Sequence, residues 1–78
     1  MNKQRRSRIE AVISQIEELI NEVGDIHDEE SEAYDNMPES FQDSDRGCRM
    51  SEWVDALDSA YSSLEEARDY LQEQLDNE

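Results

Sequence analysis

The apolar residues in the first half of the chain recur at alternating steps of four and three. This rhythm runs through Ile9, Ile13, Ile16, Ile20, Val23, His27, Glu30, Tyr34 and Met37, with His27 and Glu30 as polar members near its far end. The spacing is a heptad pattern, typical of a helix that packs lengthwise against a partner helix. A second column repeats every seven residues beside it and contains Val12, Leu19, Ile26 and Ala33. The pattern predicts a helix over residues 8–36 whose apolar face is wider than one partner helix needs.

Capping signals set the expected limits of this helix. Ser7 can cap its start, and Glu10 stands at the reciprocal capping-box position. Pro38 ends it, because the residue before a proline is driven out of the helical region. Residues 1–7 are then expected to form a basic N-terminal tail, and residues 37–43 a polar elbow.

A second heptad rhythm predicts another helix over residues 44–77. Its expected contact positions are Met50, Trp53, Leu57, Ala60, Leu64, Ala67 and Leu71, and Val54, Tyr61 and Leu75 widen the apolar face to one side. Ser44 or Ser51 can be the N-cap.

The two helices have similar lengths and a short connection, which favours an all-α, antiparallel two-helix hairpin in a single domain over residues 1–78. An isolated hairpin leaves much of each apolar face uncovered, so we expect a homodimer that forms a four-helix bundle. A monomer, or a third short helix near the elbow, are the alternatives. The residues expected in the core or the oligomer contact are Ile9, Val12, Ile16, Leu19, Val23, Trp53, Leu57 and Leu64.

The charge balance is strongly acidic. The chain has 22 Asp and Glu residues against seven Lys and Arg, for a net charge of −15 over 78 residues. Such an excess opposes compaction, and it indicates a partner with a positive surface. An anionic membrane or a phosphate backbone would repel the chain, so neither is expected to bind it directly. The single Cys48 and the lack of a long apolar stretch are typical of a cytoplasmic protein.

Motifs for catalysis or metal binding fail on inspection. His27 and Glu30 form an i,i+3 pair on the contact column, but the contact positions of the second helix include no Asp, Glu or His, so no metal site is expected. The run from Asp43 to Gly47 has the glycine one position early for a calcium loop, and Val54 stands where the bidentate Glu should be. There is no phosphate-binding glycine loop and no catalytic His, Cys or Ser set. The sequence predicts neither an enzyme nor a cofactor.

The acidic residues are the remaining signal. Outward positions of the second helix carry many carboxylates, and the stretch 28–32 forms a second patch. Solvated helix faces usually mix Lys with Glu, but the second helix has one arginine in its acidic stretch and no lysine. The candidate partner-binding residues are Asp28, Glu29, Glu32, Asp55, Asp58, Glu65, Glu66, Asp69 and Glu73. Phe41 in the elbow is expected to cover the open end of the bundle or to contact a partner, and Tyr70 is a candidate exposed anchor.

The segment from Tyr34 to Gly47, YDNMPESFQDSDRG, is similar to a linker in small uncharacterised acidic helical proteins of phages and mobile elements. Those proteins follow it with a Leu, Glu and Ala-rich helix, like Leu57 to Leu75 here. The resemblance covers residues 28–72, and Cys48 and Trp53 depart from it. It implies a small phage-type accessory protein. By analogy, acidic proteins of this kind are often inhibitors of host defence, including anti-CRISPR proteins and restriction inhibitors that imitate DNA.

The expected function is therefore non-enzymatic inhibition. The chain would act in the host cytoplasm, where it would block the basic nucleic-acid-binding surface of a nuclease or CRISPR effector by DNA mimicry. The alternative is a self-assembling coiled-coil adaptor or structural protein whose acidity serves solubility. Adaptation to high salt is a third interpretation.

Overall fold

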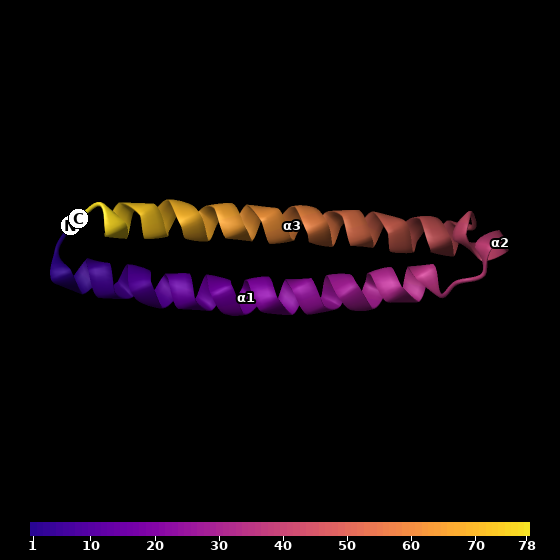
Figure 1. Cartoon of the computed structure of the whole chain (residues 1–78), viewed down its shortest axis with the longest axis horizontal. Coiled ribbons are helices and arrows are strands. Elements are labelled where there is room, and N and C mark those ends of the chain that lie inside the picture. The colour runs from indigo at the N-terminus through magenta and orange to yellow at the C-terminus, as the bar shows by residue number, and fades with distance from the viewer.

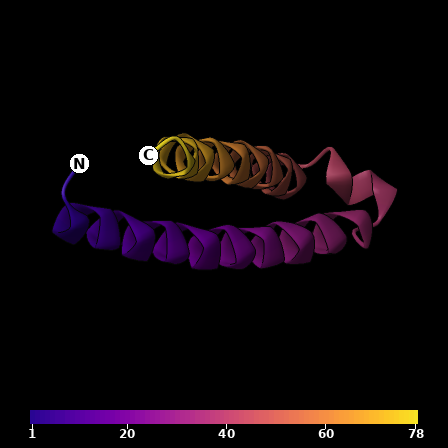
Figure 2. The same cartoon turned by 60° about the vertical axis from the view of Figure 1, so that its left-hand side comes forward.

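The computed structural model describes residues 1–78 as three helices and no strand. Helix α1 spans Lys3–Asp35, α2 spans Glu39–Gln42 and α3 spans Asp45–Asp76. The two long helices run antiparallel and pack along their whole length (Figure 1, Figure 2). The result is a rod of 58 × 15 × 14 Å. The all-helical class and the packed pair of long helices predicted from the heptad rhythm are confirmed.

Helix α1 begins earlier than expected. It starts at Lys3, and the side chain of Asn2 caps it by accepting a hydrogen bond from the Arg5 backbone N–H at 2.8 Å. The prediction of a basic tail over residues 1–7, with Ser7 as the cap, is therefore wrong. Arg6 explains the difference. Its guanidinium pairs with Glu78 Oε2 at 2.9 Å and donates to the Leu75 carbonyl at 3.3 Å, so the first turn of α1 is attached to the last turn of α3.

The elbow contains the short helix that the sequence left as an alternative. Pro38 is the N-cap of α2, whose last residue, Gln42, donates to the carbonyls of Tyr34 and Met37, both at 3.2 Å. Ser44 then caps α3 by accepting from the Gly47 N–H at 3.3 Å, so the first of the two expected caps is the one used.

The contact positions of α1 are the ones the rhythm predicts. Every one of them is buried or half-buried, and Ile13 and Ile20 are the most enclosed, at 5% and 4% exposure. Of the residues expected in the core, Ile9, Ile16, Val23, Leu57 and Leu64 are half-buried between the two long helices. This set of α1 positions, together with its α3 counterpart, is the seam of the hairpin.

The seam of α3 differs from the expected one. It consists of Met50, Val54, Leu57, Tyr61, Leu64, Arg68, Leu71 and Leu75, all of which are buried or half-buried. Trp53, Ala60 and Ala67 lie outside it, and Trp53 is 53% exposed, so its expected place in the hairpin core is wrong. The helix is rotated by one position, so that Val54, Tyr61 and Arg68 take the places of these three residues. Burying Tyr61 in place of Ala60 removes more apolar area from water.

None of the three helices combines the length and the apolar character that crossing a lipid bilayer requires.

Candidate partner-binding surface

The seam divides the surface of the hairpin into two flanks. On a helix, residues that directly follow a contact position lie on one side of it and residues that directly precede it lie on the other. Because α1 and α3 are antiparallel, the following residues of both helices share one side of the rod. Gly24 and Asp58, for example, line the same hollow, and so do Glu10 and Gln72.

Carboxylates dominate the side formed by the following residues. We call this side the acidic flank, and its members are Glu10, Glu17, Asp28, Asp35, Asp55, Asp58, Glu65, Asp69 and Asp76. Asp28 of α1 and Asp58 of α3 line one shallow hollow beside Gly24 and Tyr61. The fold thus brings Asp28 of one predicted acidic patch onto the same surface as Asp55, Asp58, Glu65 and Asp69 of the other.

Gly24 allows α1 and α3 to pack closely beside this hollow. A Cβ at this position would lie 3.1 Å from the Tyr61 ring, so the glycine lets the ring approach the α1 backbone. His27 lines the same hollow, and its Nδ1 lies 3.2 Å from Asp28 Oδ1.

The nine candidate residues fall into two groups. Asp28, Asp55, Asp58, Glu65 and Asp69 lie on the acidic flank. Of the remaining four, Glu32, Glu66 and Glu73 lie on the outward backs of the two helices. Glu29 directly precedes the contact position Glu30, so it lies on the side opposite the acidic flank. The structure therefore does not bring the whole predicted set together.

Most of the candidate carboxylates have no cation beside them. Only Asp28, next to His27, and Asp69, whose Oδ1 lies 3.1 Å from Arg68 Nε, are within ion-pair distance of a basic group. Glu65 is half-buried and the other eight are exposed. An exposed ion pair contributes only about 0–1 kcal/mol, so these pairs offset little of the mutual repulsion. Most of the negative charge of the candidate set is therefore exposed and unpaired.

The predicted set lacks four carboxylates of this surface, which are Glu10, Glu17 and Asp35 of α1 and Asp76 of α3. Glu10 and Glu17 directly follow Ile9 and Ile16, as Asp58 and Glu65 follow Leu57 and Leu64. The signal was present in the rhythm of α1, and comparing each acid with its nearest contact position would have found both.

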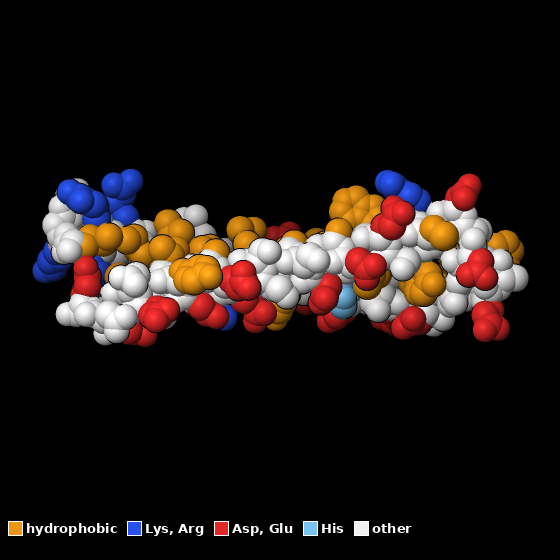
Figure 3. Space-filling model, turned by 90° about the horizontal axis from the view of Figure 1, so that it is seen from above, with side chains coloured by type: hydrophobic (Ala, Val, Ile, Leu, Met, Phe, Trp, Pro, Cys, Tyr) orange, Lys and Arg blue, Asp and Glu red, His pale blue; other side chains and the backbone are white.

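The opposite side of the rod is apolar. We call it the apolar flank, and its members are Val12, Leu19, Ile26 and Ala33 of α1 with Trp53, Ala56, Ala60, Ala67 and Tyr70 of α3. No residue of α3 that directly precedes a contact position is acidic, and on α1 only Glu22 and Glu29 are. In Figure 3 hydrophobic side chains follow the upper edge between two groups of basic side chains, and carboxylates gather along the lower edge.

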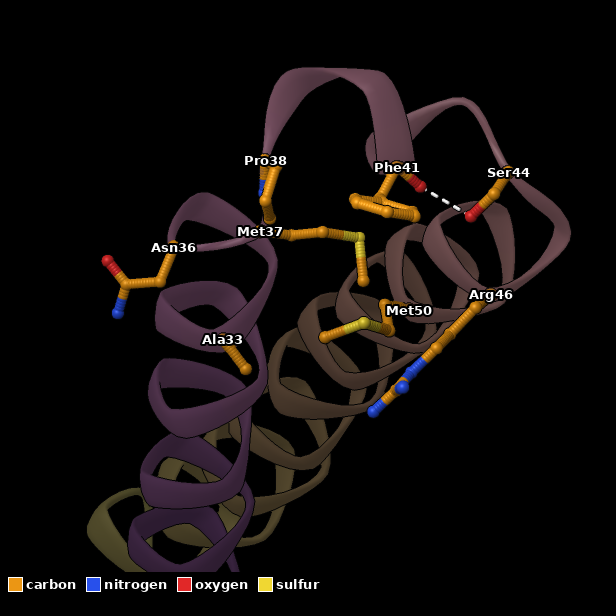
Figure 4. A pocket seen from close by; sticks show the side chains of 8 residues that line it. All are labelled: Ala33, Asn36, Met37, Pro38, Phe41, Ser44, Arg46 and Met50. Atoms are coloured by element: carbon orange, nitrogen blue, oxygen red, sulfur yellow. Dashed lines mark hydrogen bonds between the residues drawn. The ribbon is translucent and has the colours of Figure 1, made fainter.

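A hollow of about 590 Å³ lies at the elbow end, beside the apolar flank. Ala33, Met37, Phe41 and Met50 line it, and Figure 4 shows Phe41 and the two methionines around the same space. Phe41 lies over the end of the seam and is still 58% exposed, so both functions expected of it are open. No Asp, Glu, His or Cys lines this hollow, and no group of three or more such residues anywhere in the structure is placed to hold a metal ion.

No protein-family model matches this chain, and no curated protein or solved structure is significantly similar to it.

Proposed function

We propose that this protein is a non-enzymatic inhibitor whose acidic flank occupies the basic nucleic-acid-binding surface of a host protein and excludes the nucleic acid by mimicry. A phage or mobile-element origin, suggested by the linker resemblance, belongs to the same proposal. The observation that supports it is the gathering of exposed, mostly unpaired carboxylates from two helices on one side of a rigid rod.

The density of charge on the acidic flank is close to that of a nucleic-acid strand. Its nine carboxylates extend from the level of Glu10 to that of Asp35, a length of about 38 Å at 1.5 Å per helical residue. This gives about one charge per 4 Å, against about 3.4 Å for successive phosphates of one DNA strand. A basic groove that follows a phosphate strand would therefore meet a comparable series of charges.

The proposal includes the homodimer expected from the heptad pattern. With the apolar flank covered by a second copy, each acidic flank would face outward, and one assembly would offer two of them. A dimer also suits the second candidate function, a self-assembling coiled-coil adaptor, which the exposed apolar flank favours and for which the acids would serve solubility.

The two candidate functions differ in whether binding depends on where the negative charges lie or only on how many there are. In one variant Asp28, Asp55, Asp58 and Asp69 are changed to Asn and Glu65 to Gln, which neutralises the acidic flank at five positions. The matched control changes Glu18, Glu32, Glu52, Glu66 and Glu73 to Gln, so it loses the same charge from the backs of the helices.

Tagged protein is incubated with the heparin-binding fraction of a bacterial lysate, and captured protein is eluted with stepwise salt or with a 20-base-pair DNA duplex. We expect the original protein and the control to capture a basic protein that the duplex releases, and the flank variant to capture at least about tenfold less. Equal capture by both variants, or capture that DNA does not release, would contradict mimicry and leave the adaptor function.

A further inference from the structure

The hairpin exposes more surface than a compact protein of its size. Its accessible surface is 6031 Å², whereas a folded monomer of 9.1 kDa exposes about 4,900 Å². The difference, about 1,100 Å², exists because each long helix has only one neighbour. A standard protein–protein interface removes about 800 Å² from each partner. One interface of ordinary size would therefore bring this chain to a normal ratio of surface to mass.

Charge decides which side that interface can use. Two copies with a net charge of −15 each repel, and contact between acidic flanks would place carboxylates against carboxylates. The apolar flank is the side that avoids this. It exposes 48% of Leu19 and 53% of Trp53, and interface cores are depleted of charge and enriched in aromatic residues.

The apolar flank has a complementary shape along its length. Gly24 meets Tyr61, and Arg6 meets Leu75, so this antiparallel register places Leu19 and Ile26 across from Ala67 and Ala60. Large side chains thus form a ridge on α1 and alanines form a trough on α3. At the elbow end the relation reverses, because Trp53 of α3 lies across from Ala33 of α1.

We propose that a second copy of this chain covers the apolar flank, with the two-fold axis parallel to the long helices. Helix α1 of each copy then packs on α3 of the other, and the elbows of both copies lie at the same end. Leu19 and Ile26 enter the alanine trough of the second copy, and Trp53 covers its Ala33 at the mouth of the elbow hollow. If the two-fold axis instead ran perpendicular to the long helices, α1 would pack on α1 and α3 on α3. The large side chains of the two α1 helices would then press on each other, and the alanines of the two α3 helices would leave a gap.

This inference rests on the dimer of the proposed function and is independent of what the acidic flank binds. The single native cysteine, Cys48, tests it, since it is exposed near the elbow and outside the apolar flank. Spin labels on the two Cys48 residues of a dimer should lie roughly 20–30 Å apart in the proposed orientation, given helix spacings of about 10 Å. If the two-fold axis ran across the helices, the two Cys48 residues would lie at opposite ends of the dimer, each about 14 helical residues from its centre. The spin labels would then be about 45 Å apart. A dimeric mass with the short distance supports the proposal, and the long distance or a monomeric mass overturns it.

A pair of neighbouring substitutions locates the interface. Ala60→Glu adds a carboxylate to the trough, whereas Ser59→Glu adds one to the outward back of the same helix. Both positions are exposed in the hairpin, and equal helicity by circular dichroism checks the fold. We expect Ala60→Glu to raise the dissociation constant of the dimer at least about tenfold and to remove the concentration-dependent shift of Trp53 fluorescence. We expect Ser59→Glu to change the constant less than about threefold. Equal weakening by both would overturn the interface. Capture by the acidic flank is a separate assay, so its failure is distinguishable from this one.

Discussion

The two glycines of the chain have different reasons to be glycine, although both lie inside helices. At Gly24 a side chain would press against the edge of the Tyr61 ring, which can shift. At Gly47 a Cβ would overlap the Gln42 carbonyl oxygen and would lie 2.6 Å from that of Phe41. Those atoms belong to the backbone that turns from α2 into α3, so they cannot shift without moving the elbow.

Gly47→Ala should therefore destabilise the hairpin even though alanine is the better helix former. Alanine would gain up to about 1 kcal/mol of helix propensity, but the overlap should exceed that gain and leave a net loss of about 1–3 kcal/mol. The measurement is urea unfolding followed by circular dichroism. Ala11→Gly is the control for propensity alone, since Ala11 is exposed on the outward back of α1 and belongs to neither flank. A Gly47→Ala protein as stable as the original would mean that the elbow is not held as described.

At the scale of elements, the sequence predicts α1 better than α3. In α1 the residues that alternate at steps of four and three from Ile9 to Met37 are the ones that the structure buries against α3. In α3 two columns compete, because Trp53, Ala60 and Ala67 are one residue ahead of Val54, Tyr61 and Arg68. The second column contains Arg68, a residue that is usually exposed. In the structure Arg68 is half-buried, because its aliphatic stem packs in the seam while its guanidinium pairs with Asp69. Only the facing surface of α1 decides between the columns.

The candidate site was predictable to a smaller extent. Asp28 and Asp58 belong to different helices, and their meeting depends on the register of the hairpin, which the Gly24–Tyr61 contact fixes. Glu66 and Glu73 could not be separated from the acidic flank because the expected seam of α3 was rotated. The partner that we propose for the acidic flank was not predictable, because its shape is not encoded in this chain.

The attachment of the first turn of α1 to the last turn of α3 leads to a local prediction. Arg6→Gln removes the pairing with Glu78 and the hydrogen bond to the Leu75 carbonyl. Because the pair is partly exposed, the loss in global stability should stay below about 1 kcal/mol. Hydrogen exchange should nevertheless become faster in the last turn of α3, where helix ends open first. Lys3→Gln removes the same charge without an ion pair and should leave exchange there unchanged. If both variants behave alike, net charge rather than the Arg6 contacts holds the ends.

For the whole molecule, the balance between seam and charge predicts a response to salt. Raising sodium chloride from 50 to 500 mM at fixed protein concentration shortens the screening length from about 14 to about 4 Å. Relief of about 1 kcal/mol of repulsion should raise Tm by roughly 4–8 °C in a domain of this size. Potassium chloride should act equally, and the variant with the neutralised acidic flank should respond less. A Tm that falls with salt would show that attractive pairs outweigh the repulsion.

The single elbow also imposes an order on folding. The seam pairs residues on the two sides of the elbow, from Met37 with Met50 through Gly24 with Tyr61 to Arg6 with Leu75 at the far end. The entropy lost in closing a loop grows with its length, so the pair nearest the elbow forms at the lowest cost, and each new pair shortens the loop left for the next. The residue pairs of the seam should therefore form in order from the elbow to the chain ends and separate in the reverse order. Pulling the N- and C-termini apart would therefore break the seam contacts one pair at a time. Pulling the two long helices past each other along the rod would load all of these contacts at once.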